Sequence, residues 1–278
     1  MIRPKPIGEY TRRQYTYDWL VPGLLERQDR LLLTGAEGGG KTVMCRQFAA
    51  TLAAGLHPFT GHLIPGQEAG YRVLVIDAEN SEQQTARGYK WILNKVQAIR
   101  EEQGLTGESW RDNLLVSCHP SGIDLQSPND INQVDKALSD IAPDMLVAGP
   151  LYKLHMANPN EEAPLRQIVG TIDSMRERHN VALITECHAG NGTGPQGQRD
   201  MRPIGSSLLR RWPEFGLGMS RAKTDPGVGR AQIVDLLPWR GGRDERDWPD
   251  QLKHGTYLPW QATDPEYFDK VSKWDYNE

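Results

Sequence analysis

The residues best suited to chemistry in this sequence lie in one glycine-rich segment near its start. The candidate phosphate-contacting positions run without a break through Gly35, Ala36, Glu37, Gly38, Gly39, Gly40, Lys41, Thr42 and Val43. From Gly35 to Thr42 they match the pattern G-x-x-x-x-G-K-[ST], whose glycines let successive backbone N–H groups converge on phosphate oxygens. Lys41 would reach the terminal phosphates, and Thr42 would offer its hydroxyl to Mg²⁺. The sequence therefore predicts a nucleoside triphosphate site, with ATP and Mg²⁺ as the cofactors.

The surroundings of this segment support the prediction. An apolar run, Leu31–Leu33, precedes it, and a helical pattern follows over about 41–54. A strand that leads into such a loop and a helix that leaves it are the context the motif requires, because the helix N-terminus adds positive potential at the phosphates.

Two carboxylates follow the next apolar run, 73–76. Asp77 and Glu79 are two residues apart, so on an extended chain they face the same side. In an open parallel sheet the carboxyl ends of the strands border the ligand site. We therefore expect Glu79 to orient a water molecule for attack on the γ-phosphate.

The metal-binding carboxylate is harder to assign. P-loop enzymes usually end the strand at 145–149 with an aspartate for Mg²⁺, whereas this sequence has Gly149, and Asp144 lies at the other end of that strand. Either Thr42 and the phosphates hold Mg²⁺ alone, or Asp77 or Glu79 supplies the missing oxygen. We favour Asp77.

Apolar runs that alternate with helical patterns indicate an α/β fold. Such alternation predicts a mostly parallel twisted sheet with helices on both faces, and two later runs, 215–219 and 233–237, are expected to pair antiparallel. We divide the chain into a basic N-terminal arm (1–18), an ATPase core (19–240) and a charged, aromatic C-terminal extension and tail (241–278).

Composition excludes several classes of protein. The 278 residues carry a net charge of −4, which argues against a globally basic nucleic-acid binder but leaves local basic patches possible. The three cysteines, Cys45, Cys118 and Cys187, are isolated, so a disulfide framework is not expected and a cytoplasmic location fits. No apolar run is long enough to cross a membrane.

The order of these segments resembles RecA-like ATPases of the hexameric replicative helicase type, such as plasmid RepA and bacterial DnaB, and most of all the single-domain forms of phages and plasmids. The resemblance runs from about Trp19 to Arg240. It implies that Glu79 is the catalytic glutamate and that His188 senses the γ-phosphate. Gly149 departs from the family pattern.

The resemblance also implies residues that act on the nucleotide of a neighbouring subunit. Arg211, which precedes Trp212, is the best match to the arginine finger, with Arg210 beside it. Arg221 and Lys223 are similar to the Lys/Arg pair that reaches a neighbour's nucleotide from a strand end. The expected assembly is a homo-oligomer, specifically a hexamer.

Two long irregular stretches are candidates for contact with nucleic acid. They follow the fourth and fifth strands, at 153–160 and 190–205, and loops of this length are uncommon unless they bind or move. In a ring both would face the central channel, where Lys153, Arg199 and Arg202 could track the backbone of single-stranded DNA.

The leading hypothesis from the sequence is an ATP-hydrolysing motor that translocates on single-stranded DNA as a ring, a replicative DNA helicase. One alternative is a RecA-fold ATPase that binds or loads onto DNA in recombination without unwinding it. Another is a nucleotide-gated scaffold with low turnover, which Gly149 keeps open.

Overall fold

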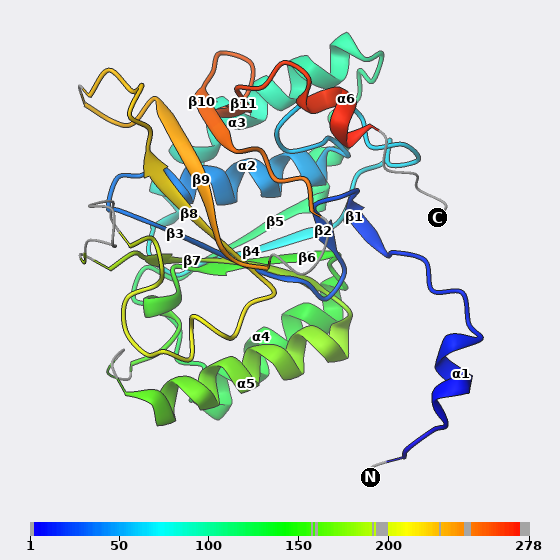
Figure 1. Cartoon of the computed structure of the whole chain (residues 1–278), viewed down its shortest axis with the longest axis vertical. Coiled ribbons are helices and arrows are strands. Elements are labelled where there is room, and N and C mark those ends of the chain that lie inside the picture. The colour runs from blue at the N-terminus through cyan, green and yellow to red at the C-terminus, as the bar shows by residue number, and fades with distance from the viewer. Residues whose placement is uncertain are drawn as a thin grey trace.

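The protein is described by a computed structural model (Figure 1). The structure describes residues 3–156, 158, 161–190, 192, 200–227, 229–241 and 246–272. Its centre is a nine-stranded sheet with helices on both faces.

The sheet is parallel on one side and antiparallel on the other. Its strand order is β11-β10-β9-β8-β3-β7-β6-β4-β5. Neighbours from β8 to β5 pair parallel, while β9, β10 and β11 add antiparallel strands. The predicted fold class is therefore confirmed. The strand bounds are β3 (Arg30–Gly35), β4 (Val73–Asp77), β5 (Leu114–Cys118), β6 (Met145–Gly149), β7 (Ala182–His188), β8 (Phe215–Arg221), β9 (Ile233–Arg240), β10 (Gln251–His254) and β11 (Trp260–Ala262).

Two pairs of helices cover the sheet. On one face lie α2 (Lys41–Ala53) and α3 (Glu82–Glu102), and on the other lie α4 (Pro128–Ile141) and α5 (Glu162–His179) (Figure 1). Among the described residues no helix combines the length and the apolar character needed to cross a membrane. The remaining elements are short: α1 (Ile7–Thr11), a hairpin of β1 (Trp19–Val21) and β2 (Leu25–Glu26), the 3₁₀ turns η1 (Ser109–Asn113) and η2 (Leu151–Lys153), and α6 (Tyr267–Val271).

Strand β7 shows how the period of two divides side chains between the faces. Ala182 and Ile184 belong to the core cluster that contains α2, whereas Leu183 and Cys187 belong to the cluster that contains α5. Alternation along the strand therefore directs Glu186 toward α2, the helix that begins with the glycine-rich loop.

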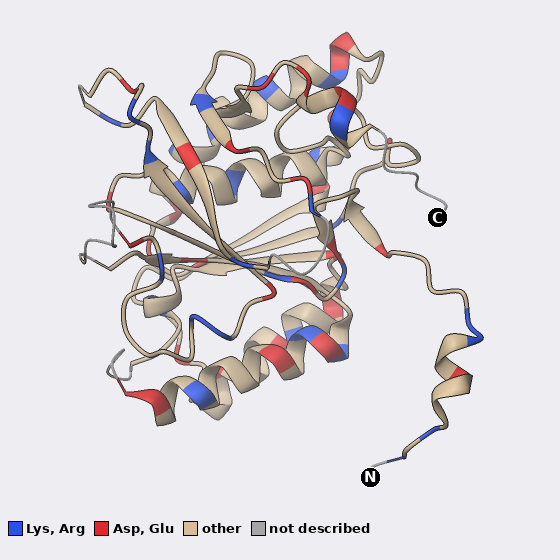
Figure 2. Cartoon of the chain, viewed as in Figure 1, with Lys and Arg blue, Asp and Glu red and all other residues tan. Residues whose placement is uncertain are grey.

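The two terminal segments differ in how they pack. No residue of α1 is buried, and the arm with its basic residues extends away from the body (Figure 2). The C-terminal extension instead continues the sheet, and Trp260 and Tyr267 are each 2% exposed. Trp260 and Tyr267 thus pack in the protein's own core.

The C-terminal extension also supports the glycine-rich loop. The Gln47 amide of α2 pairs with the backbone of Trp260, donating to its carbonyl at 2.7 Å and accepting from its N–H at 2.7 Å. The Trp260 indole N–H donates to the Gly40 carbonyl at 3.3 Å. A Cβ on Gly40 would lie 2.4 Å from the Trp260 ring, so this position requires glycine.

Candidate nucleotide site

The glycine-rich loop joins β3 to α2 with the backbone that phosphate binding requires. Gly38 and Gly40 have φ values of +70° and +90°, which only glycine adopts readily. Lys41 is buried, and its ammonium donates to the carbonyls of Gly35 at 3.2 Å and Ala36 at 2.9 Å. The lysine is therefore held inside the loop, next to the N–H groups that would contact phosphate.

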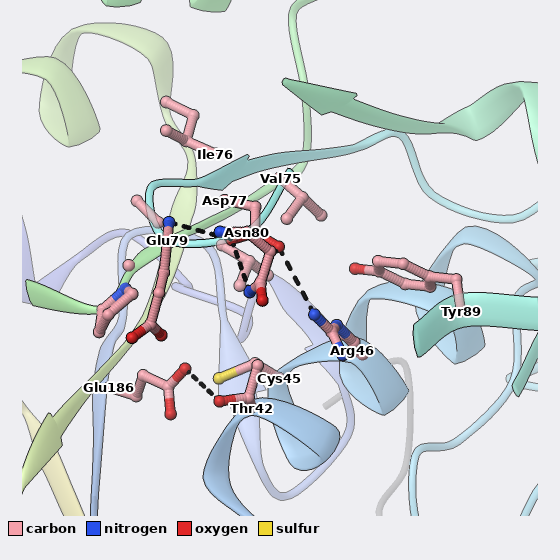
Figure 3. Close-up of a pocket in the computed structure, with 14 residues that line it drawn as sticks. Thr42, Cys45, Arg46, Val75, Ile76, Asp77, Glu79, Asn80, Tyr89 and Glu186 are labelled. Atoms are coloured by element: carbon pink, nitrogen blue, oxygen red, sulfur yellow. Dashed lines mark hydrogen bonds and ion pairs between the residues drawn. The ribbon is translucent and has the colours of Figure 1, made fainter. Parts of the chain in front are cut away.

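The hydroxyl of Thr42 is bound by a buried carboxylate. Thr42 Oγ1 donates to Glu186 Oε1 at 2.8 Å (Figure 3). Glu186 is only 6% exposed. Burial raises the pKa of Glu186, and the Thr42 hydrogen bond and the charge of Lys41 oppose that rise.

Glu79 extends into the same cleft. Figure 3 shows its side chain reaching from the end of β4 toward Glu186 and Thr42. The Tyr152 hydroxyl, on η2, donates to Glu79 Oε1 at 2.6 Å. Partial burial and this bond to a carboxylate raise the pKa of Tyr152 to about 12. The predicted water-orienting glutamate is thus at the nucleotide cleft and in contact with the loop that follows β6.

His188 lies beside this pair, at the end of β7. Its ring is tilted against that of Tyr152, with the ring centroids 5.8 Å apart. The register pairs His188 with Gly35 of the glycine-rich loop. His188, the predicted γ-phosphate sensor, therefore lies at the same ends of the strands as the glycine-rich loop.

Asp77 has a different set of contacts from the one expected of a metal ligand. Its Oδ1 accepts from the backbone N–H groups of Glu79 at 3.2 Å and Asn80 at 2.9 Å, and its Oδ2 accepts from the Thr85 hydroxyl at 2.9 Å. Arg46 forms an ion pair with it at 3.6 Å. Burial opposes ionisation, but the hydrogen bonds outweigh it and lower the pKa of Asp77. Asp77 fixes the turn that carries Glu79, and the carboxylate bonded to Thr42 is that of Glu186.

The donor atoms at this cleft suit Mg²⁺. A hydroxyl and a carboxylate converge there, and hard oxygen ligands are those Mg²⁺ prefers, usually with one or two carboxylates plus substrate phosphates. The described residues contain no group of three or more His, Cys, Asp or Glu that could hold a metal by themselves. The Thr42 hydroxyl and the Glu186 carboxylate fit a Mg²⁺ ion that also binds nucleotide phosphates.

Gly149 lines the same cleft as Glu186. It pairs with Asp77 across β4 and β6. A Cβ at this position would lie 3.4 Å from Thr185 Oγ1 and 3.6 Å from the Glu186 backbone nitrogen, which are ordinary contacts. Crowding therefore does not require glycine at position 149.

The candidate trans-acting residues lie at the two opposite ends of the strands. Arg211 precedes Trp212, whose indole bonds Asp173 on α5 at 3.1 Å and packs on Arg30, where β3 begins. Trp212 therefore lies at the amino ends of the parallel strands, opposite the glycine-rich loop. Arg211 is exposed and donates to the Ser207 hydroxyl at 3.0 Å, and Arg210 is also exposed.

Arg221 lies at the carboxyl ends of the strands, on the same side as the glycine-rich loop. Met219 pairs with Gly35 there, and β8 continues to Arg221. Its guanidinium donates to the Gly229 carbonyl at 2.5 Å and lies 3.6 Å from Asp225. Lys223, two residues beyond the strand, is exposed.

The candidate DNA-contacting residues follow the ends of β6 and β7. Lys153 closes η2, and its carbonyl accepts from the Ile123 N–H at 2.9 Å. Arg202 is exposed, and its N–H donates to Asp200 at 3.0 Å. Arg199 lies outside the described residues.

Three residues of the cleft were not singled out from the sequence: Glu186, Tyr152 and Arg46. Glu186 ends the apolar run Ala182–Thr185, and a carboxylate at the end of a buried strand was the available signal. Tyr152 and Arg46 carry no such local signal, since only the fold brings them to Glu79 and Asp77.

The fold and the site define a P-loop ATPase with a RecA-like fold. Residues 2–194 match a family model described as AAA domain (AAA_25), and the chain belongs to this family. Among solved structures, the crystal structure of the RadB recombinase is similar, with a TM-score of 0.55 and 13% sequence identity over 88% of this chain and 92% of that chain. A search of curated proteins gives no match.

Proposed function

We propose that this protein is an ATP-hydrolysing motor that translocates on single-stranded DNA as a hexameric ring and so acts as a DNA helicase. The observation that carries the proposal is the hydrogen bond between Tyr152 and Glu79. It joins the residue expected to orient water to the segment expected to contact DNA.

The hydrolytic chemistry follows from the side chains of the cleft. Lys41 and the loop N–H groups would bind the terminal phosphates, and Mg²⁺, held beside Thr42, would neutralise phosphate charge. Glu79 would accept a hydrogen bond from the attacking water and so orient it. While Tyr152 donates to Glu79, it competes with that water for the carboxylate.

Tyr152 is placed to connect this chemistry to DNA. It belongs to η2, which also contains the candidate contact Lys153 and leads into the irregular stretch after β6. A DNA backbone bound by Lys153 would shift η2 and release Glu79. This link supports an ATPase that is stimulated by DNA.

The position of Arg211 supports a ring. Within one subunit Arg211 precedes Trp212, which lies at the end of the strands opposite the glycine-rich loop, so we expect Arg211 to act on the nucleotide of another subunit. A head-to-tail arrangement that closes on itself would bring this end to a neighbour's cleft at every interface.

The proposal is tested by measuring ATP hydrolysis with and without single-stranded DNA, and strand displacement on a forked duplex. We expect DNA to stimulate hydrolysis and ATP to drive displacement. An equal rate of ATP hydrolysis with and without DNA would contradict the motor function and favour the nucleotide-gated scaffold.

A substitution of Tyr152 by Phe tests the link directly. We expect the DNA-free rate of hydrolysis to rise about 2- to 10-fold, because an exposed hydrogen bond contributes about 0.5–1.5 kcal/mol. The DNA-bound rate should stay close to that of the parent, so the stimulation ratio falls.

Tyr10→Phe is the matched control, because it also removes a tyrosine hydroxyl, from the exposed helix α1. Steady-state ATPase rates over a titration of single-stranded DNA give both quantities. If Tyr152→Phe has the same two rates as the parent, the hydroxyl does not connect DNA to Glu79.

A second function is favoured by the fold comparison. The likeness to the RadB recombinase supports a RecA-fold ATPase that binds DNA in recombination without unwinding it. DNA-stimulated hydrolysis without displacement of a forked strand would select this function over the helicase.

A further inference from the structure

We propose that Glu186 is the metal-holding carboxylate of this ATP site, in place of the aspartate that P-loop enzymes carry at the end of the neighbouring strand. The inference rests on the ATP site of the proposed function. It assigns the metal-coordinating role to a residue that neither the glycine-rich loop nor Gly149 predicts.

The first argument is the partner of Glu186. Its Oε1 accepts from Thr42 Oγ1 at 2.8 Å, and Thr42 is the hydroxyl that the loop motif assigns to Mg²⁺. The two oxygens come from α2 and β7, so the structure brings a hydroxyl and a carboxylate to one point beside the phosphate loop (Figure 3).

The second argument is the row of residues at the strand ends. Asp77 pairs with Gly149, and Gly149 lies against Glu186. The usual metal-binding position is thus a glycine with a carboxylate on each side. The oxygens of Asp77 already accept hydrogen bonds from two backbone N–H groups and from the Thr85 hydroxyl, and they pair with Arg46. The carboxylate of Glu186 instead contacts Thr42.

The third argument is burial. An ionised carboxylate that is 6% exposed is costly unless a cation compensates it. Lys41 supplies part of that compensation, but its ammonium is bonded to Gly35 and Ala36. A divalent cation beside Thr42 would complete it, and Glu186 would hold that cation directly or through a water molecule.

Gly149 is consistent with a metal-binding carboxylate on β7 in place of one at the end of β6. An aspartate there would enter the cleft that Glu186 already occupies. Two carboxylates so close would disfavour each other's ionised form. A residue without a side chain at 149 leaves the metal-binding role to Glu186.

The experiment measures the binding of a fluorescent ADP analogue to the full-length protein with Mg²⁺ and with EDTA, without DNA and without hydrolysis. For Glu186→Gln we expect the Mg²⁺-dependent gain in affinity to fall about 10- to 100-fold, as for the loss of a metal-supporting residue. Affinity in EDTA should be retained, because the loop and Lys41 are intact.

Glu82→Gln is the matched control, since it neutralises an exposed carboxylate in the first turn of α3, outside the cleft. It should keep the full Mg²⁺-dependent gain. Glu186→Gln with the same gain as the parent would overturn the proposal, and so would an equal loss in both variants.

Glu186→Asp covers the case in which the glutamine variant does not fold, as judged by its melting temperature. The shorter carboxylate should raise the Mg²⁺ midpoint while leaving affinity in EDTA unchanged, and an unchanged midpoint would overturn the proposal. A parent protein that binds no nucleotide under either condition would contradict the ATP site itself, and this inference with it.

Discussion

Glu79→Gln should bind ATP but hydrolyse it at least about 100-fold more slowly than the parent, because positioned acid–base groups contribute about 10²–10⁴-fold. The amide keeps the shape of the side chain and the contact with Tyr152 but cannot accept a proton from water. A ring that holds unhydrolysed ATP should also stay on single-stranded DNA.

Single-turnover hydrolysis and the lifetime of the complex on DNA measure the two effects. Glu82→Gln is the matched control, because Glu82 is exposed in the first turn of α3, three residues beyond Glu79. Equal turnover in Glu79→Gln and the parent would remove Glu79 from the catalytic role.

Arg211→Ala should lose about 10³–10⁵-fold in turnover, the contribution of an arginine that stabilises phosphoryl transfer. The distinctive result is expected on mixing. An equal mixture of Arg211→Ala and Glu79→Gln subunits should regain about a quarter of parental activity, because that share of head-to-tail interfaces joins an intact Glu79 to an intact Arg211.

Subunit exchange must be confirmed by mass before the mixed sample is assayed. Arg166→Ala is the control, because Arg166 is an exposed arginine whose ion pair with Glu162 on α5 contributes little. Confirmed mixed oligomers that show no regain would place Arg211 outside the catalytic interface.

Much of this site could be predicted because its signals are local. The glycine-rich loop needs consecutive residues in a fixed order, and the alternation of apolar runs with helical patterns specifies a parallel sheet. Glu79 and His188 could be assigned to the same ends of the strands, because Glu79 follows a buried strand and His188 ends one.

The remainder depends on contacts between distant residues. Thr42 and Glu186 are 144 positions apart, and Tyr152 and Glu79 are 73 apart, so no local pattern joins either pair. The place of Asp77 at the end of a strand favours it as the metal ligand, but the sequence cannot show that the turn it begins engages its oxygens. The packing of Trp260 on the loop was equally out of reach.

The support that Trp260 gives to the glycine-rich loop has a consequence for biosynthesis. The indole meets Gly40 across 220 positions, and its backbone meets Gln47 across 213. A chain emerging from the ribosome has made its phosphate loop long before it makes β11, and contacts of such sequence separation form late. The loop of the nascent protein can therefore gain this support only after β11 has been synthesised and has paired with β10.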